Sequence, residues 1–190
     1  MRDWSSDVCS SDLNNRSIAW GIAKKLSEHG ANLAFTYLGD ALKKRVVPLA
    51  ESLKSSFILS CDVEKKEDII KTFNDIKNKW ENLDFVVHAI AFSERSELSG
   101  EYLNTSRENF LKSMLISCFS FTEVAKEASK IMNKGSSMLT LTYESSKVIP
   151  NYNVMGVCKA ALESSVKYLA RDLGSKGIRI NAIKIGRAHV

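Results

Sequence analysis

Two tyrosines and a lysine lie close together in the sequence and have the chemistry to move protons beside a bound cofactor. Tyr143 follows an apolar run, 138–142, that predicts a strand, and Tyr152 opens a predicted helix that contains Lys159. The seven-residue step from Tyr152 to Lys159 is close to two helical turns, so both side chains project from one side of the helix, roughly 10 Å apart along its axis. A tyrosine is a poor acid, with a pKa of about 10, and a nearby ammonium group lowers that pKa and can hold a cofactor hydroxyl. Spacing alone does not distinguish this arrangement from a chance pair on a helix surface.

Composition predicts an ordinary globular chain rather than a nucleic-acid or membrane protein. The net charge is +5 and the sequence pI is about 9.0, but the basic residues alternate with acidic ones and have no aromatic stacking platform beside them. No apolar run approaches the ~20 residues of a membrane span, and the N-terminus lacks the order of a signal peptide. The four cysteines show no CxxC spacing, which indicates reduced thiols and a cytoplasmic location. No histidine or cysteine pair has metal-ligand spacing, so we predict no metal.

The two ends of the chain do not continue the pattern of its interior. Residues 1–13 repeat Ser-Ser-Asp at 5–7 and 10–12 and show neither a strand nor a helix period. The final residues, 186–190, also break off within the pattern of the chain. Both ends resemble translated sequencing adapters. We interpret 1–13 and 185–190 as non-native termini on either side of one incomplete domain, 14–184, with a natural but unusual tail as the alternative.

Between these ends, predicted strands alternate with predicted helices. The strands are apolar throughout, which is typical of a parallel sheet covered on both faces. Right-handed crossovers then give an α/β fold, a doubly wound Rossmann-type sheet whose ligands bind beyond the carboxyl ends of the strands. The predicted helices span 17–29, 41–53, 66–79, 107–132 and 152–173, and the predicted strands span 32–37, 57–61, 84–90, 137–142 and 178–183.

Three further residues have the chemistry of a site, each with a structural alternative. The helix after Ser17 could bind a phosphate at its N-terminus, but no glycine precedes it before Gly21, so an ordinary capped helix explains it equally. Asp62 follows a strand and could bond an adenine amino group or cap the next helix. His88 lies inside an apolar strand, where a hydrogen-bonded core histidine is a better interpretation than a catalytic one.

The interior of the chain resembles the bacterial enoyl-[acyl-carrier-protein] reductase (NADH) of type II fatty-acid synthesis, a divergent branch of the short-chain dehydrogenase/reductase superfamily. The resemblance covers 14–184, and its most specific motif is Pro-Asn-Tyr-Asn-Val-Met-Gly at 150–156, with Lys159 three residues later. The other matching stretches are 17–23, 34–37, 61–63, 88–92, 139–143 and 179–183.

One spacing separates this family from its relatives. Ordinary short-chain reductases place the tyrosine four residues before the lysine, where this chain has Met155, whereas its tyrosine is Tyr152. The resemblance therefore implies reduction of a carbon–carbon double bond rather than of a ketone. The alternatives are another short-chain dehydrogenase/reductase, such as a ketoacyl reductase, and a non-catalytic nucleotide-binding fragment.

The resemblance also implies roles for individual residues. NADH delivers a hydride to the β-carbon of a trans-2-enoyl thioester attached to acyl carrier protein, and Tyr143 and Tyr152 stabilise the enolate oxygen. Lys159 binds the nicotinamide ribose. The implied cofactor-binding residues are Ser17, Ile18, Leu38, Asp62, Val63 and Ile90, and Ser93 lies beside the acyl substrate. No arginine directly follows Tyr37, which favours NADH over NADPH, although Lys43 and Arg45 weaken that preference.

The chain also departs from the family pattern. The family's first strand is absent, as is a glycine at the position of Ser11. The family continues after Ile183 through a cofactor-contacting segment and substrate-binding helices, which are absent too. We therefore expect the parent protein to be the enzyme and a homotetramer, and this truncated chain to be inactive.

Overall fold

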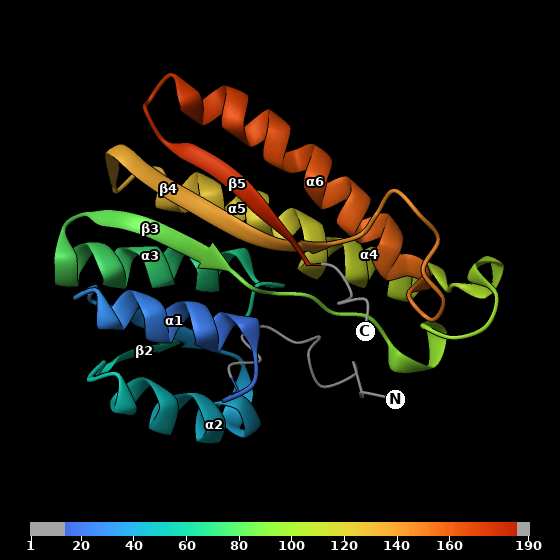
Figure 1. The fold of residues 1–190 in the computed structure, drawn as a ribbon, viewed down its shortest axis with the longest axis horizontal. Helices are drawn as coiled ribbons and strands as arrows, with labels where there is room; N and C mark the ends of the chain where they lie inside the picture. The colour runs from blue at the N-terminus through green and yellow to red at the C-terminus, as the bar shows by residue number, and fades with distance from the viewer. Residues whose placement is uncertain (1–13, 186–190) are drawn as a thin grey trace.

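The structure is a computed structural model that describes residues 14–185, and their strands form two parallel sheets (Figure 1). In the first sheet, β1 (Ala34–Tyr37) pairs with β2 (Phe57–Ser60), with Ala34 opposite Phe57. In the second, β4 (Met132–Tyr143) lies between β3 (Leu83–His88) and β5 (Arg179–Ile185). His88 is opposite Thr140, and Tyr143 is opposite Ile185.

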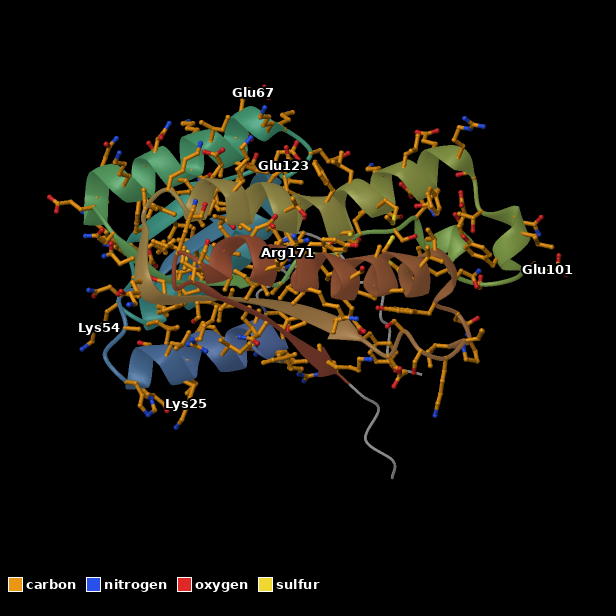
Figure 2. All side chains as sticks on the ribbon, turned by 90° about the horizontal axis from the view of Figure 1, so that it is seen from above. Lys25, Lys54, Glu67, Glu101, Glu123 and Arg171 are labelled. Atoms are coloured by element: carbon orange, nitrogen blue, oxygen red, sulfur yellow. The ribbon has the colours of Figure 1, made fainter. Side chains whose placement is uncertain are left out.

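Helices cover both faces of the sheets, which confirms the predicted doubly wound Rossmann-type α/β fold. α1 (Ile18–Glu28) and α2 (Gly39–Ser52) pack on one face. The other face is covered by α3 (Lys66–Trp80), α4 (Arg107–Met114), α5 (Ser120–Ala128) and α6 (Asn153–Gly174). Figure 2 shows α1 below the sheet and these helices above it. The split into two sheets was not predicted as such.

Local sequence explains where the helices begin and which face they bury. The Ser17 hydroxyl accepts a hydrogen bond from the Trp20 amide at 3.1 Å and caps α1. In α3, Ile69, Phe73 and Ile76 recur at helical spacing and are buried. Most helix and strand ends lie within two residues of the prediction, the usual uncertainty of such boundaries.

The prediction of one helix over 107–132 is wrong. A π-helical turn, Leu115–Phe119, separates α4 from α5, and α5 ends at Ala128. The Ser120 hydroxyl donates to the Ile116 carbonyl at 2.6 Å, an alternative partner for backbone that widens the turn. β4 begins at Met132, earlier than predicted, because the Leu83 amide already pairs with the Ile131 carbonyl at 2.9 Å.

The buried apolar residues form two clusters of unequal size. The larger cluster packs β3, β4 and β5 against α3, α5 and α6, and includes Phe121, Met138 and Leu162. The smaller cluster packs β1 against α1 and α2 through Ala23, Phe35, Val46 and Ala50. The two clusters lie on opposite faces of β2, since Phe57 and Leu59 pack against the larger cluster and Ile58 packs against the smaller one.

Candidate active site

The predicted site residues all lie at the carboxyl edge of the strands, but on two different sheets. Tyr143 ends β4, Tyr152 is the N-terminal cap of α6, and Lys159 lies in the second turn of that helix. Ile90 and Ser93 follow β3. On the two-stranded sheet, the N-terminus of α1 and the ends of β1 and β2 hold the remaining residues, which are Ser17, Ile18, Leu38, Asp62 and Val63.

The two tyrosines come together although nine positions separate them in the sequence. The centroids of the Tyr143 and Tyr152 rings are 5.1 Å apart, and the ring planes are tilted by 58°. Tyr143 is buried at the end of β4, which fixes one ring, and the loop 144–151 returns the chain so that the second ring packs against it. Such tilted aromatic pairs are favourable beyond the area they bury. Both phenols therefore belong to one cluster.

The pKa of Tyr152 is shifted in the opposite direction from the prediction. Burial raises the pKa of Tyr152 above its ordinary value, and the neighbouring Tyr143 and Cys158 raise it further. The expected lowering by Lys159 is wrong, because the Lys159 Nζ instead donates to the Leu141 carbonyl of β4 at 2.9 Å. Tyr152 therefore stays a neutral phenol at neutral pH, and its hydroxyl keeps a proton that it can donate to a hydrogen bond.

Lys159 is the charged group of the cluster. Burial lowers the pKa of Lys159 to about 8, while Cys158 and Cys118 act weakly in the opposite direction. An ammonium group has three donors, and the Leu141 carbonyl takes one of them. Lys159 thus remains largely protonated near neutral pH and has donors to offer a ligand hydroxyl.

A cluster of charged residues that we did not predict contacts the end of β4 beside Tyr143. The Lys184 Nζ lies 3.6 Å from Glu144 and 3.3 Å from Glu163, and the Thr142 hydroxyl donates to Glu163 at 3.0 Å. The Ser146 hydroxyl donates to Glu144 at 2.6 Å and lowers the pKa of that carboxyl to about 2. These contacts join β4, β5 and α6 around the tyrosine.

A second set of contacts that we did not predict positions the loop of Ser93. The Asn109 amide oxygen of α4 accepts hydrogen bonds from the Glu94 amide at 2.9 Å and the Ser113 hydroxyl at 2.9 Å, and contacts the Ser93 hydroxyl at 3.3 Å. Its amide nitrogen donates to Glu97 at 3.1 Å. Asn109 is buried. No sequence pattern marked it, since an asparagine in a helix is ordinary.

Of the residues predicted to bind the pyrophosphate and the adenosine of a cofactor, Ser17 and Asp62 form side-chain bonds, in the described part of the chain, only with residues nearby in the sequence. The Ser17 hydroxyl donates to the Asn14 carbonyl at 3.0 Å in addition to its capping role. The Asp62 carboxylate accepts from the Glu64 amide at 3.0 Å and pairs with Lys65 at 3.4 Å, and it makes no side-chain cap for α3. Val63 is buried in the larger core, whereas Ile18 is 46% exposed at the start of α1. This exposed helix end fits a phosphate.

His88 is a core histidine, as interpreted from the sequence. Its ring nitrogens lie 3.0 Å from the Thr140 hydroxyl and 2.9 Å from the Ser120 hydroxyl. Burial, with a smaller contribution from the Lys159 charge, lowers the pKa of His88 to about 3. The ring is therefore neutral and joins β3, β4 and α5.

Met155 fills the position where a ketone-reducing relative would have its tyrosine. The side chain is 2% exposed, and the Ser117 hydroxyl contacts its sulfur at 3.7 Å. This position belongs to the core and supplies no phenol, which argues against the ketoacyl reductase alternative.

Two other kinds of site are missing from residues 14–185. In this part of the chain, no group of three or more histidine, cysteine, aspartate or glutamate side chains could hold a metal ion. No helix among the same residues has the length and apolar character needed to cross a membrane.

Comparisons with known proteins identify the family of the chain. The family profile described as Enoyl-(Acyl carrier protein) reductase matches residues 13–189. The chain is 60% identical over 174 residues to enoyl-[acyl-carrier-protein] reductase [NADH] 2 of Rhizobium meliloti (strain 1021), and 53% identical to the enzyme FabI of Rickettsia typhi. These alignments cover 91% of this chain but 65% and 67% of the relatives.

Solved structures give the same result. The chain matches the enoyl-acyl-carrier-protein reductase of Anaplasma phagocytophilum in complex with NAD, with a TM-score of 0.88 and 55% identity. It also matches the Bacillus cereus enzyme with NADP+ and an indole naphthyridinone, with a TM-score of 0.89 and 50% identity. The alignments cover 91% and 93% of this chain and 67% and 70% of those structures. The chain belongs to the enoyl-(acyl carrier protein) reductase family.

Proposed function

We propose that the complete protein reduces the trans-2 double bond of enoyl thioesters on acyl carrier protein, with NADH, in type II fatty-acid biosynthesis. The observation that supports this most directly is the pairing of Tyr143 with Tyr152 above a buried Lys159, with Met155 in the core. The relatives' names include both NADH and acyl carrier protein. The chain spans about two thirds of their length, so the activity of the whole protein is part of the proposal.

The chemistry of NADH, when bound, is donation of a hydride. Reduction of the double bond places negative charge on the thioester oxygen, and the Tyr152 hydroxyl, neutral because burial raises its pKa, donates a hydrogen bond there. Tyr143 holds the Tyr152 ring and borders the same space. The raised pKa of Tyr152 favours stabilisation of the oxygen by a hydrogen bond over full proton transfer from that phenol.

The residue types present suit a dinucleotide. In the proposed arrangement, one part of the cofactor contacts residues of the three-stranded sheet and the rest contacts residues of the two-stranded sheet. Lys159, with donors beyond its bond to Leu141, would hold the nicotinamide ribose, and Ile90 would border the cofactor's middle. The exposed start of α1 at Ser17 and Ile18 would bind the pyrophosphate. The adenosine end would lie against Leu38, Asp62 and Val63, and Ser93 would lie beside the acyl chain. The absence of an arginine directly after Tyr37 supports NADH over NADPH.

We expect the 190-residue chain alone to be inactive, because its cofactor-binding residues lie on sheets that no strand pairing joins within residues 14–185. The measurement is NADH oxidation with crotonyl-CoA by the purified chain. Turnover by this chain would refute the expectation of inactivity. NADH binding without turnover would instead support the reading of a non-catalytic nucleotide-binding fragment.

The role of Tyr152 is tested in a chain extended to the length of its relatives. Tyr152→Phe should lower the rate of enoyl reduction by at least about 10²-fold, the lower end of the contribution typical of such a group, with NADH affinity retained. Tyr168→Phe is the matched control, because Tyr168 lies on the same helix and is 66% exposed. Equal rates for the two variants would contradict the proposed role.

We also infer a homotetramer and a cytoplasmic location. Leu111 and Phe119, on α4 and the π-helical turn, are 61% and 51% exposed, an apolar surface that fits an interface between copies. Replacing both by lysine should reduce the mass measured by light scattering. The matched change at Val148, 96% exposed in the loop after β4, should leave it unchanged. The cytoplasmic location is supported by Cys61, Cys118 and Cys158, which are buried free thiols.

A further inference from the structure

Two asparagines flank Tyr152, and the backbone of both has an uncommon conformation. The φ angle is 59° at Asn151 and 30° at Asn153, the first residue of α6. Positive φ belongs to the left-handed region of the backbone, which asparagine enters more readily than other residues apart from glycine. Residues in such conformations cluster at functional sites and persist only where the surrounding structure holds them. The start of α6 therefore depends on contacts that keep Tyr152 in its place.

The two asparagines differ in their side-chain contacts. The Asn153 amide nitrogen donates to the Glu97 carbonyl at 3.0 Å and to the Gly100 carbonyl at 3.3 Å, 56 and 53 positions earlier in the sequence. An amide nitrogen carries two hydrogens, so this group is fully used on one segment of the loop after β3. Figure 1 shows that loop beside the start of α6. Asn151 is exposed, and its side chain makes no hydrogen bond within residues 14–185.

Glu97 connects the segment that Asn153 holds to the residues that position Ser93. Its carboxylate accepts hydrogen bonds from the Ser106 amide at 2.8 Å and the Ser106 hydroxyl at 2.7 Å, at the start of α4. These bonds lower the pKa of the Glu97 carboxyl, which stays ionised at neutral pH. The same carboxylate accepts from the amide nitrogen of Asn109, whose oxygen contacts the Ser93 hydroxyl at 3.3 Å. Backbone and side chain of Glu97 thus join α6 to the loop of Ser93.

We propose that Asn153 is a positioning residue for the reduction of the enoyl group. Its amide group holds the segment 97–100 against the start of α6 and acts through Glu97, so that the Tyr152 hydroxyl keeps a fixed position relative to the acyl group beside Ser93. Tyr152 directly precedes Asn153, and its ring packs on Tyr143, so a shift of the helix start moves the phenol. A misplacement of about 1 Å is enough to lower a rate about 10²-fold. This inference rests on the proposed function.

Substitution by glycine separates the amide group from the backbone conformation. Asn153→Gly keeps access to positive φ but removes both donors to the loop. Asn151→Gly is the matched control, because it makes the same change on the other side of Tyr152 at a residue that also has positive φ. In a chain extended to the length of its relatives, Asn153→Gly should lower kcat for crotonyl-CoA at least about tenfold, and Asn151→Gly should change it little. Equal kcat values for Asn153→Gly and the unaltered chain would overturn the proposal.

Binding of NADH distinguishes a positioning role from a general loss of structure. The contacts of Asn153 are with the loop after β3, whereas the residues proposed to hold the cofactor lie elsewhere. Asn153→Gly should therefore keep the dissociation constant of NADH and the number of sites per chain, measured by NADH fluorescence, while kcat falls. A merely structural role would lower the fraction of chains that bind NADH by the same factor as kcat, and that result would overturn the proposal.

A double-mutant cycle tests the connection through Glu97. Glu97→Ala removes the carboxylate that Ser106 and Asn109 bind, but leaves the backbone carbonyl to which Asn153 donates. If Asn153 acts through Glu97, the two substitutions together should lower kcat by less than the product of their separate effects, because residues of one network are not independent. A combined effect equal to that product would overturn the proposed connection.

Hydrogen exchange followed by mass spectrometry tests the contact without the reaction. Asn153→Gly should speed exchange within 94–106, because the loop is released from α6, and Asn151→Gly should not. Unchanged exchange in Asn153→Gly, with normal enoyl reduction by the unaltered extended chain, would overturn the role of Asn153 alone. A lack of enoyl reduction by the unaltered extended chain would instead overturn the proposed function, and with it the effect on kcat.

Discussion

In the three-stranded sheet, contacts between separate elements hold Tyr152 and Lys159, whereas at the two-stranded sheet the polar side chains of Ser17 and Asp62 are held only locally. Lys159 of α6 bonds to β4, and Tyr152 packs on Tyr143. Within the described residues, by contrast, the side chains of Ser17 and Asp62 bond to residues no more than three positions away.

This difference follows from the number of neighbours that each strand has. β4 is paired on both sides and lies above the larger apolar core, while β1 is paired on one side and rests on the smaller core. A central strand brings distant segments to one edge and fixes them there. The comparison teaches that the arrangement of Tyr143, Tyr152 and Lys159 can be well formed in a chain whose proposed phosphate-binding end, at the start of α1, belongs to a different sheet.

The largest expected effects test whether the two cores are separate stability units. Phe121→Ala, in the larger core, should lower the free energy of unfolding by about 3–5 kcal/mol, and Val46→Ala, in the smaller core, by about 2 kcal/mol. Both side chains are fully buried. Hydrogen exchange followed by mass spectrometry should show faster exchange throughout the chain for Phe121→Ala, but only within about 18–60 for Val46→Ala. If Val46→Ala increased the rate of hydrogen exchange throughout the chain, the two cores would form one cooperative unit, and the contrast between the two sheets would be wrong.

The second test concerns the cost of burying a charge in the better-formed sheet. Because burial lowers the pKa of Lys159 to about 8, the unfolded chain binds more protons than the folded chain between about pH 8 and its ordinary pKa of 10.5. Stability from this group therefore rises with pH across that window, by about 3 kcal/mol in total. The raised pKa values of Cys158, about 12, and of Tyr152 have the opposite effect above about pH 9.

The variant Lys159→Met isolates the lysine, because Cys158 and Tyr152 are common to both proteins. Its stability minus that of the unaltered chain should decrease by about 3 kcal/mol between about pH 7 and pH 10.5. Urea unfolding at several pH values measures this difference. A difference that stays constant with pH would mean that Lys159 is not held in a desolvating environment.

The third test loosens the loop that positions Ser93. Asn109→Ala leaves the Glu94 amide and the Ser113 hydroxyl without their acceptor, so we expect a loss of about 1–3 kcal/mol in the free energy of unfolding. Asn78→Ala, on the exposed face of α3, is the matched control and should change stability little. Thermal and urea unfolding of both variants measure this difference. Equal losses of unfolding free energy in the two variants would mean that Asn109 does not position the loop of Ser93.

The fold was largely predictable because its signals are local. Apolar strands alternating with amphipathic helices are visible in any window of the sequence, and the cap at Ser17 marks the start of α1. The helix over 107–132 was mispredicted because its apolar period continues through the π-helical turn 115–119, where the Ser120 hydroxyl bonds to the Ile116 carbonyl. Pairing with β3 then extended β4 back to Met132.

The positions of the candidate site residues in the fold were predictable, but their electrostatics were not. The predicted helix begins within one residue of α6, so that Tyr152 is its N-terminal cap and Lys159 lies within it, whereas the partner of the lysine depended on which carbonyl β4 presents to it. The contacts of Asn109 and of Lys184 with distant segments required the strand order and register, which sequence spacing does not contain. The roles of Ser17, Leu38, Asp62, Val63, Ile90 and Ser93 in binding remain predictions.

The smallest expected effect concerns the ionic cluster beside Tyr143. Lys184 contacts Glu144 and Glu163 but is 43% exposed, so Lys184→Met should cost less than about 1 kcal/mol of stability. The cost should shrink at high salt, because ions screen partly exposed pairs. Lys167→Met, an exposed change on α6, is the control. Urea unfolding at low and high salt measures both variants. A larger loss that does not change with salt would mean that this cluster is needed to hold β5 against β4. The three-stranded sheet would then depend on contacts at its edge strand as well as on its apolar core.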